Sequence, residues 1–284
     1  MNIFITYSNE KYARARDFAI KKALDCGRFD KAIGYSPDSI DNNFKQKNSR
    51  ILSIKRGGGL WLWKPYVIRK ALIEECNDGD VLFYSDSGAF FFRSVLPLVK
   101  SFNSNIQTYL LPYIEEEFTK KETIEALDAN EESITKTPQR MATMMMIRKC
   151  DESLAFIEEW LEQCQRLELI LPVTDFDNQI PNFVSHREDQ SIFSILAKKH
   201  GIASLPDPSL CNLFGMRKFK DIGFIPTGKA EYHCIVIHRR TCVTPLSLLK
   251  HLKNLFVNYI YNIVGYEKNI PKCTWRKREE TKNK

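Results

Sequence analysis

The sequence predicts an α/β fold with a mainly parallel central sheet. Three observations predict it. The first segments alternate strand, helix and strand, an apolar run of strand length ends in a carboxylate, and 43% of the 284 residues are hydrophobic. A chain of this length and apolar content can bury a substantial core. Its 27% charged and 12% aromatic residues are typical of a packed protein rather than a disordered one.

The first third of the chain carries the strand and helix rhythm. Residues 3–7 predict a buried strand, and residues 10–25 carry apolar side chains at helical spacing. Gly27 is a plausible helix stop, and residues 32–35 predict a second short strand. A strand, helix, strand order favours parallel pairing of the two strands.

A second helix and strand follow a run of glycines at positions 57–59. Pro65 suits the first turn of a helix that runs to about residue 76, because the amide hydrogen it lacks is unpaired there. Residues 81–84 then form an apolar strand that leads into Ser85 and Asp86. Open α/β sheets bind their ligands at the carboxyl ends of such strands.

The later elements are predicted by the same patterns. Residues 114–139 are polar and acidic, which predicts a mobile, lid-like loop. The remaining elements are expected as a strand at 141–147, a helix at 152–167, a helix that opens at residues 186–191 and runs to about 200, and a final strand at 234–237.

The composition changes near residue 245. Apolar residues recur there at helical spacing among lysines, and the chain finishes in a basic tail. We therefore expect one domain over residues 1–243 and a basic amphipathic helix and tail over residues 244–284. Contact with a membrane surface and packing of the helix on the domain explain its apolar side equally well.

Cysteine usage and hydropathy bear on the compartment. Eight cysteines occur without a CxxC pair, which favours reduced thiols over a zinc site or a disulfide framework. No signal-peptide pattern opens the sequence, and no apolar run approaches the roughly 18 residues of a membrane span. We expect a cytoplasmic protein, in peripheral contact with the inner face of the membrane if the basic helix binds lipid. The net charge of +7 favours anionic partners such as nucleic acid, lipid head groups or a pyrophosphate.

Two constellations point to phosphate chemistry. Asp86 at a strand end can hold a divalent cation against a diphosphate, although a turn cap explains it equally well. Around the glycine run, Arg56 and Lys64 offer positive charge, and Trp61 and Trp63 can stack on a sugar or a base. The spacing matches neither a Walker A loop nor a Rossmann fingerprint. A flexible linker with two core tryptophans is the alternative.

Two further constellations lie late in the chain. Glu188 and Asp189 begin a helix, where capping alone accounts for an acidic residue. His238 follows the last strand and is succeeded by Arg239 and Arg240. A histidine there can ligate a metal and the arginines can clamp a diphosphate, or the histidine is simply solvated beside a basic turn.

These segments together resemble the GT-A glycosyltransferases. Residues 81–88 are similar to the DxD element of that class, with Asp86 at one acidic position and Gly88 where a second Asp would stand. The segment Gly-Gly-Gly-Leu-Trp-Leu-Trp-Lys-Pro-Tyr at 57–66 resembles one found in members that assemble bacterial polysaccharides. The resemblance covers residues 1–241 and lies mainly in the order of its elements.

The resemblance implies transfer of a sugar from a nucleotide-sugar, expected to be a UDP-sugar, to a glycan or lipid-linked acceptor in capsule, O-antigen or similar polysaccharide synthesis. It implies a Mn²⁺ or Mg²⁺ ion held by Asp86 and His238, with Asp189 as base or sugar ligand and Gln190 beside the anomeric carbon. His186 and Asp175 are the expected acceptor-binding residues. The implied donor-binding residues are Thr6, Tyr7, Ser8, Arg56, Gly57, Trp63, Lys64, Asp86, Ser87, Gly88, Arg239 and Arg240.

Other functions remain compatible with the sequence. A nucleotidyltransferase or a sugar-nucleotide hydrolase also uses acidic groups and a cation on phosphates. A nucleic-acid-binding protein would account for the net charge and the basic residues 272–284, but no recognition helix, zinc finger or RNP strand is evident. We expect no nucleic-acid partner.

Overall fold

The computed structural model describes residues 1–210, 232–238, 241–246, 249, 253 and 256. By its internal contacts the chain divides into two units, Met1–Val243 and Thr244–Lys284.

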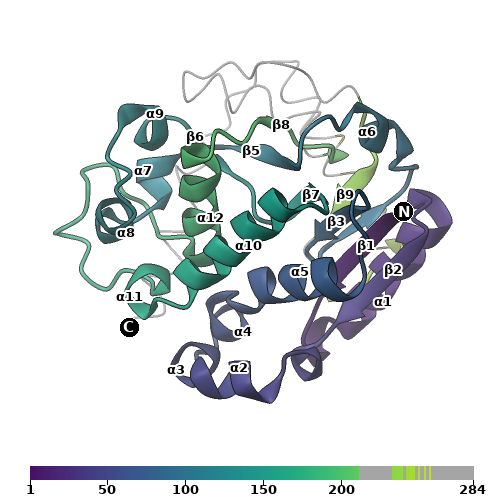
Figure 1. Ribbon diagram of the computed structural model, residues 1–284, viewed down its shortest axis with the longest axis horizontal. Helices are drawn as coiled ribbons and strands as arrows, with labels where there is room; N and C mark the ends of the chain where they lie inside the picture. The colour runs from purple at the N-terminus through teal and green to yellow at the C-terminus, as the bar shows by residue number, and fades with distance from the viewer. Residues whose placement is uncertain (211–231, 239–240, 247–248, 250–252, 254–255, 257–284) are drawn as a thin grey trace. The chain divides into compact units, whose positions relative to one another are not determined.

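The first unit alternates strands and helices along its length (Figure 1). Its strands are β1 (Asn2–Tyr7), β2 (Lys31–Tyr35), β3 (Val81–Ser85), β4 (Ala89–Phe91), β5 (Ile106–Ile114), β6 (Pro138–Arg140), β7 (Met144–Arg148), β8 (Ser204–Pro206) and β9 (Ile235–Ile237). Its helices are α1 (Ala13–Lys22), α2 (Asn42–Lys47), α3 (Ser49–Leu52), α4 (Gly57–Leu60), α5 (Trp63–Glu74), α6 (Leu96–Ser101), α7 (Glu115–Phe118), α8 (Lys121–Ala126), α9 (Glu132–Thr135), α10 (Asp151–Cys164), α11 (Leu167–Ile170) and α12 (Glu188–Lys199). Among the described residues it also has the short 3-10 helices η1 (Glu10–Tyr12) and η3 (Pro37–Ser39) and the π-helix η2 (Ala23–Gly27).

Over the part of the chain that the structure describes, the central sheet has seven strands in the order β2-β1-β3-β7-β5-β6, with β8 paired to β5. The pairs β1–β2, β1–β3 and β5–β8 are parallel, whereas β7 is antiparallel to both of its neighbours and β6 is antiparallel to β5. Five strands therefore run in one direction, and β6 and β7 run in the other. The predicted α/β class with a mainly parallel sheet is confirmed, and the antiparallel β7 at its centre was not foreseen.

Side chains alternate between the two faces of the sheet, as the pleat requires. Ile5 and Tyr84 belong to one hydrophobic core, together with side chains of α5, α10 and α12. Phe4 and Phe83 belong to the other, together with side chains of α1, β4 and β9. Helix α10 lies beside α5 and α12 (Figure 1). Helices thus cover one face, and α1 with the β4–β9 ribbon covers the other.

The prediction of a lid-like loop over residues 114–139 is wrong. The segment forms α7, α8, α9 and β6, and Glu115 and Thr119 are completely buried. Two of the acidic side chains that suggested a solvated loop are paired: Lys198 contacts Glu115 and Lys136 contacts Glu116. A charged side chain can be buried when an oppositely charged group is buried beside it, so charge in a sequence does not by itself predict exposure.

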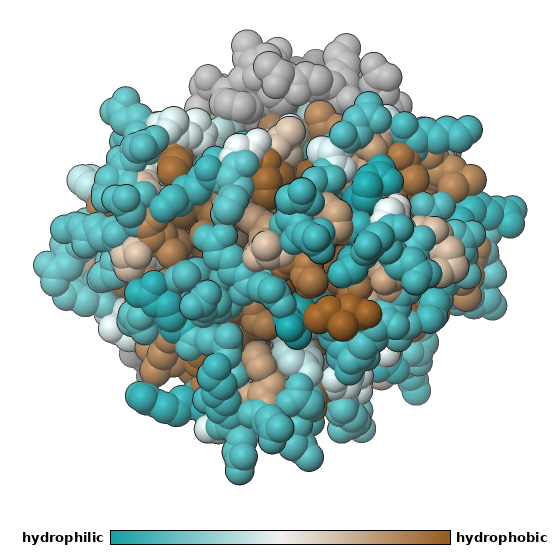
Figure 2. All heavy atoms as spheres, in the orientation of Figure 1, coloured by the Kyte–Doolittle hydropathy of each residue, from teal (hydrophilic) through white to brown (hydrophobic). Residues whose placement is uncertain are grey.

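Polar side chains spread over most of the visible face of the molecule, with hydrophobic atoms showing between them (Figure 2). In the second unit, Leu246, Leu249 and Phe256 are 63–64% exposed. Among the residues that the structure describes, no helix has both the length and the hydrophobicity to cross a bilayer.

Candidate active site

A left-handed turn precedes α5. Five consecutive residues, from Gly57 to Trp61, have φ between +52° and +97°. A Cβ on Gly59 would approach Leu52 Cα to 2.8 Å, so this position requires glycine. Leu60 and Trp61 adopt the same region at a conformational cost, and such strain tends to gather at functional sites.

The turn delivers Lys64 into a group of buried charges. Lys64 Nζ lies 3.0 Å from Asp189 Oδ2 and 3.4 Å from Asp86 Oδ1. The side chains of Lys64 and Asp189 are 4% and 5% exposed, whereas that of Asp86 is 32% exposed. Tyr84, two residues before Asp86, donates its hydroxyl to Asp86 Oδ1 at 2.6 Å. Residues from α5, the end of β3 and the start of α12 therefore meet at one ammonium group, and we call Lys64, Asp86 and Asp189 the charge triad.

The charges of the triad depend on one another. Burial raises the pKa of Asp189 to about 7, although Lys64 opposes that rise. Burial alone would lower the pKa of Lys64, but the two carboxylates outweigh it and hold that pKa above its ordinary value. Burial and the neighbouring Asp86 raise the pKa of Tyr84 well above 10, so its hydroxyl keeps its proton. The triad thus contains a permanent cation.

The start of α12 is fixed from several sides. Arg56 Nε lies 2.5 Å from Glu188 Oε1, and Glu188 has a φ of +42°. Trp160 donates its indole N–H to the carbonyl oxygen of Asp189 at 3.0 Å. Arg56, which the sequence predicts as a diphosphate ligand, therefore links the glycine turn to the helix that carries Asp189.

Gln190 is held inside the fold. Its Oε1 accepts from the main-chain N–H of Ala142 at 3.3 Å, and its Nε2 donates to Gln139 Oε1 at 2.8 Å. Gln139 in turn donates to Glu115 Oε1 at 3.1 Å. Both ends of the amide predicted to lie beside the anomeric carbon are therefore engaged with the protein.

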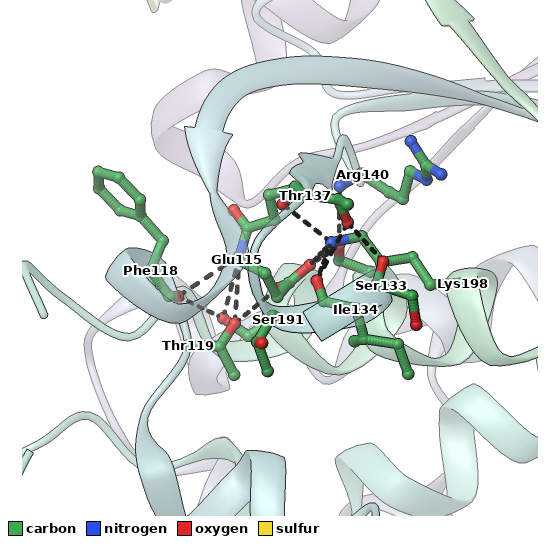
Figure 3. Close-up of polar contacts among 12 residues, drawn as sticks. Glu115, Phe118, Thr119, Ser133, Ile134, Thr137, Arg140, Ser191 and Lys198 are labelled. Atoms are coloured by element: carbon green, nitrogen blue, oxygen red, sulfur yellow. Dashed lines mark hydrogen bonds and ion pairs between the residues drawn. The ribbon is translucent and has the colours of Figure 1, made fainter. Parts of the chain in front are cut away.

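Gln190 connects through Gln139 to a buried polar network around Glu115 and Lys198, which the sequence did not predict (Figure 3). Glu115 lies between Thr119 and Lys198, with Lys198 Nζ 2.7 Å from Glu115 Oε2 and Thr119 donating to Glu115 Oε1. The same ammonium donates to the carbonyl oxygens of Ile134 and Thr137. We call this set of contacts the Lys198 network. It couples α7, α9 and the residue before β6 to α12.

The end of β1 lies at the same edge of the sheet as Asp86, because Ile5 pairs with Tyr84 in parallel register. The Tyr7 ring stacks on the Trp63 ring at 3.8 Å, so these two predicted donor ligands contact each other. Burial, aided by Asp38, raises the pKa of Tyr7 to about 12. The hydroxyls of Thr6 and Ser8 are buried without a hydrogen-bond partner among the described residues. Buried polar groups of this kind call for a ligand or a water.

The β4–β9 ribbon brings His238 to the turn that contains Asp86. The main-chain N–H of His238 donates to the Gly88 carbonyl at 2.8 Å, next to the paired residues Ala89 and Ile237. The buried His238 ring lies 5.7 Å from the Phe90 ring. Ser87 is buried in the same turn. Arg239 and Arg240 lie outside the described residues.

The side chains present do not fit a divalent cation of their own. Within the described ranges, no group of three or more His, Cys, Asp or Glu side chains converges as a metal site. Gly88 offers no side-chain ligand, and Asp86 Oδ1 already accepts from Tyr84 and faces Lys64. Mg²⁺ takes six oxygen ligands in near-octahedral geometry and is usually held by one or two carboxylates together with waters and substrate phosphates. Asp86 by itself therefore offers few protein ligands to such an ion.

The two predicted acceptor-binding residues make hydrogen bonds within the protein, His186 across the fold and Asp175 inside its own loop. His186 is buried, its Nδ1 accepts from the Lys120 N–H at 3.3 Å, and its Nε2 donates to the Leu169 carbonyl at 2.8 Å. Burial lowers the pKa of His186 to about 3. Asp175 accepts from the Asp177 main chain and the Asn178 side chain, within its own loop. Both residues stabilise the local chain path in this structure.

Among the residues that the sequence did not predict, some carried a signal in the sequence and others did not. Tyr84 stands two residues before Asp86, and alternation along a strand was a signal that they share a face. Glu115 and Lys198 gave no such signal, because their partnership is set by the packing of α7 on α12.

A cavity of about 430 Å³ opens at the other end of α12. Its lining residues are Asp128, Glu131, Ser133, Ile134, Arg140, Lys198, Lys199, Gly201, Ile202 and Ala203. The charge triad does not line it.

No family model matches the sequence, and no curated protein matches it. Among solved structures, the chain is similar to mouse xyloside xylosyltransferase 1 in its apo form, with 11% identity, a TM-score of 0.46, and coverage of 86% of this chain and 100% of that one. It is similar to the galactosyltransferase LgtC in complex with donor and acceptor sugar analogues, with 12% identity, a TM-score of 0.45, and coverage of 90% and 96%. A third similar structure is the glycosyltransferase GlyE of Streptococcus pneumoniae TIGR4 in its apo form, with 15% identity, a TM-score of 0.43, and coverage of 95% and 65%.

Proposed function

We propose that the chain is a GT-A-like glycosyltransferase that moves a sugar from a nucleotide-sugar, a UDP-sugar, to a glycan or lipid-linked acceptor in polysaccharide synthesis. One observation carries the proposal: Asp86 and Asp189, more than a hundred residues apart in sequence, meet at the Lys64 ammonium. They do so at the carboxyl ends of the parallel strands β1 and β3, where open α/β sheets bind ligands.

The chemistry of sugar transfer supports this assignment. The leaving nucleoside diphosphate gains negative charge as its bond to the sugar breaks, and a fixed positive charge lowers the free energy of that state. Lys64 is such a charge. A carboxylate that faces the sugar can orient its hydroxyls, and Asp189 is held in one position by Lys64 and by the contact of Trp160 with its carbonyl.

Further residues of the site take roles in the same proposal. The unpaired hydroxyls of Thr6 and Ser8 are suited to hydrogen-bond the nucleotide at the end of β1. Tyr7, at the end of β1, stacks on Trp63. The nucleotide can lie against this pair while the two rings stay in contact. Arg239 and Arg240 stay predictions as diphosphate ligands.

Binding of nucleotides to the full chain tests the proposal. We expect UDP to bind in calorimetry more tightly than UTP, and at least one sugar in a panel of UDP-sugars to be released by slow hydrolysis. Binding of oligonucleotides without binding of UDP overturns the proposal. Preference for UTP and release of pyrophosphate would instead identify a nucleotidyltransferase.

We further propose that the second unit binds the surface of an anionic membrane, where lipid-linked acceptors reside. Residues 244–284 contain nine Lys and Arg against three Asp and Glu, so they carry +6 of the chain's net charge of +7. Leu246, Leu249 and Phe256 expose apolar side chains within this basic segment.

Co-sedimentation with vesicles tests this contact. The full chain should sediment with phosphatidylglycerol vesicles and not with phosphatidylcholine vesicles, and a Leu249→Glu variant should lose most of that binding. Equal sedimentation of the variant, or no difference between the two lipids, contradicts membrane contact through this segment.

A further inference from the structure

The environment of the Lys64 ammonium is built for a permanent cation. Two carboxylates lie within 3.4 Å of Nζ, and the rings of Trp63 and Tyr84 lie 5.9 and 5.8 Å from it. Carboxylates and aromatic faces both stabilise an ammonium ion. The side chain is almost completely buried, so it has little freedom to turn elsewhere.

The backbone around Lys64 holds that position before any ligand arrives. The left-handed turn from Gly57 to Trp61 ends just before α5, and the Trp63 indole donates back to the Gly57 carbonyl at 2.9 Å. Pro65 fixes the first turn of α5. A charge fixed in advance does not have to reorganise when negative charge develops beside it.

A divalent ion would have to share this site with Lys64. Asp86 is the exposed carboxylate of the triad, and the residue two positions later is Gly88 instead of a second carboxylate. An ion on Asp86 would therefore bind through one carboxylate that already faces an ammonium, and two cations on one carboxylate repel each other. Lys64 therefore already supplies a positive charge at Asp86.

The two contacts of Lys64 with the triad are unequal. The contact with buried Asp189 is 3.0 Å, and the contact with the partly exposed Asp86 is 3.4 Å. A diphosphate oxygen that approaches from the exposed side can replace Asp86 at the ammonium and leave the Asp189 contact in place. Because an ammonium has three donors, it can bind Asp189 and a phosphate oxygen together.

We propose that Lys64 is the resident cation of the donor site and that the chain binds a nucleoside diphosphate without a divalent metal. This inference rests on the proposed function. It makes Asp86 a counter-ion that the donor displaces, in place of a metal ligand.

Calorimetry of UDP with the full wild-type chain, in EDTA and then in Mn²⁺, tests the inference. We expect the two dissociation constants to agree within about threefold. We expect Lys64→Met to weaken UDP binding at least tenfold in EDTA, Lys64→Arg to restore part of it, and the control Lys70→Met, on the exposed side of α5, to bind as wild type.

The outcomes separate the two levels of the proposal. Binding of UDP only in Mn²⁺ overturns the role of Lys64 and leaves the glycosyltransferase assignment intact. Unchanged binding by Lys64→Met in EDTA overturns it as well. Failure of UDP to bind under either condition overturns the assignment itself and the inference with it. The wild-type comparison needs no variant, so a Lys64 variant that fails to fold does not leave the question open.

Discussion

Two buried lysines in this molecule lie in contrasting surroundings. Lys198 donates to Glu115 and to two main-chain carbonyls, so its three donors are all used inside the fold. Lys64 faces two carboxylates, one of them 32% exposed. The Lys198 network is closed, whereas the charge triad is open on one side. A closed network serves the fold, and an open one is available to a ligand.

The pKa directions of the two lysines follow the same contrast. Burial lowers the pKa of Lys198, and the single carboxylate of Glu115 only partly opposes it. Two carboxylates raise the pKa of Lys64. The neighbouring Arg140 also lowers the pKa of Lys198, so both the number and the sign of the nearby charges set the two directions.

The largest expected effect concerns the closed network. Lys198→Met leaves Glu115 as an unpaired, completely buried carboxylate, which we expect to lower the free energy of unfolding by about 3–5 kcal/mol. Urea denaturation measures it, and the exposed neighbour Lys199 provides the control Lys199→Met. A loss below about 1 kcal/mol, typical of a surface pair, would show that the network is not closed as described.

A substitution in the charge triad should lower activity much more than stability. Asp189→Asn keeps the size of the side chain and removes its charge, and we expect sugar transfer or UDP-sugar hydrolysis to fall roughly 10²–10³-fold. The thermal midpoint should change little, because Lys64 keeps Asp86 as a partner. If UDP affinity fell and turnover did not, Asp189 would belong to nucleotide binding instead.

Burial of His186 should make the stability of the fold depend on pH. Its pKa is about 3 in the fold against 6.5 in the unfolded chain, so the unfolded state binds the extra proton. Its contribution to stability is fully present above pH 6.5 and is lost as the pH falls toward 3. The loss is roughly 1.4 kcal/mol per pH unit.

His186→Gln tests that slope, since an amide can keep both hydrogen bonds without titrating. The pH dependence of unfolding should be shallower in the variant by about one proton between pH 4 and 6. Identical slopes in the two proteins would mean that His186 is not buried as a neutral ring.

The smallest expected effect on stability concerns the glycine turn before Lys64. Gly58→Ala meets nothing closer than 3.8 Å and costs only the left-handed conformation, about 1 kcal/mol. Gly59→Ala adds a clash with the Leu52 backbone and should cost more. Thermal unfolding of the pair measures the difference, and equal costs would contradict the close approach at Gly59.

Local patterns predicted the elements that surround the triad but not the contacts within it. Strands β1 and β3 and helix α12 follow from apolar spacing and turn residues, because these signals are local in sequence. The short strands β4 and β8 have too few residues to show a period. The sequence predicted that Lys64 and Asp189 belong to one site, but it did not predict that they contact each other. It also assigned Glu115, which contacts Lys198, to a loop. Both contacts are set by packing between segments that are far apart in the sequence.

The pairing of β4 with β9 has a consequence for the synthesis of the chain. The Asp86 turn meets its antiparallel partner only when residues 235–237 leave the ribosome, long after β1 and β3 are available to pair. Contacts of such large sequence separation form late. A nascent chain that stops before β9 would carry the sheet edge and the acidic turn, yet lack the strand that borders it. Termination of translation upstream of residue 235 is therefore expected to yield a protein with an unsupported donor site.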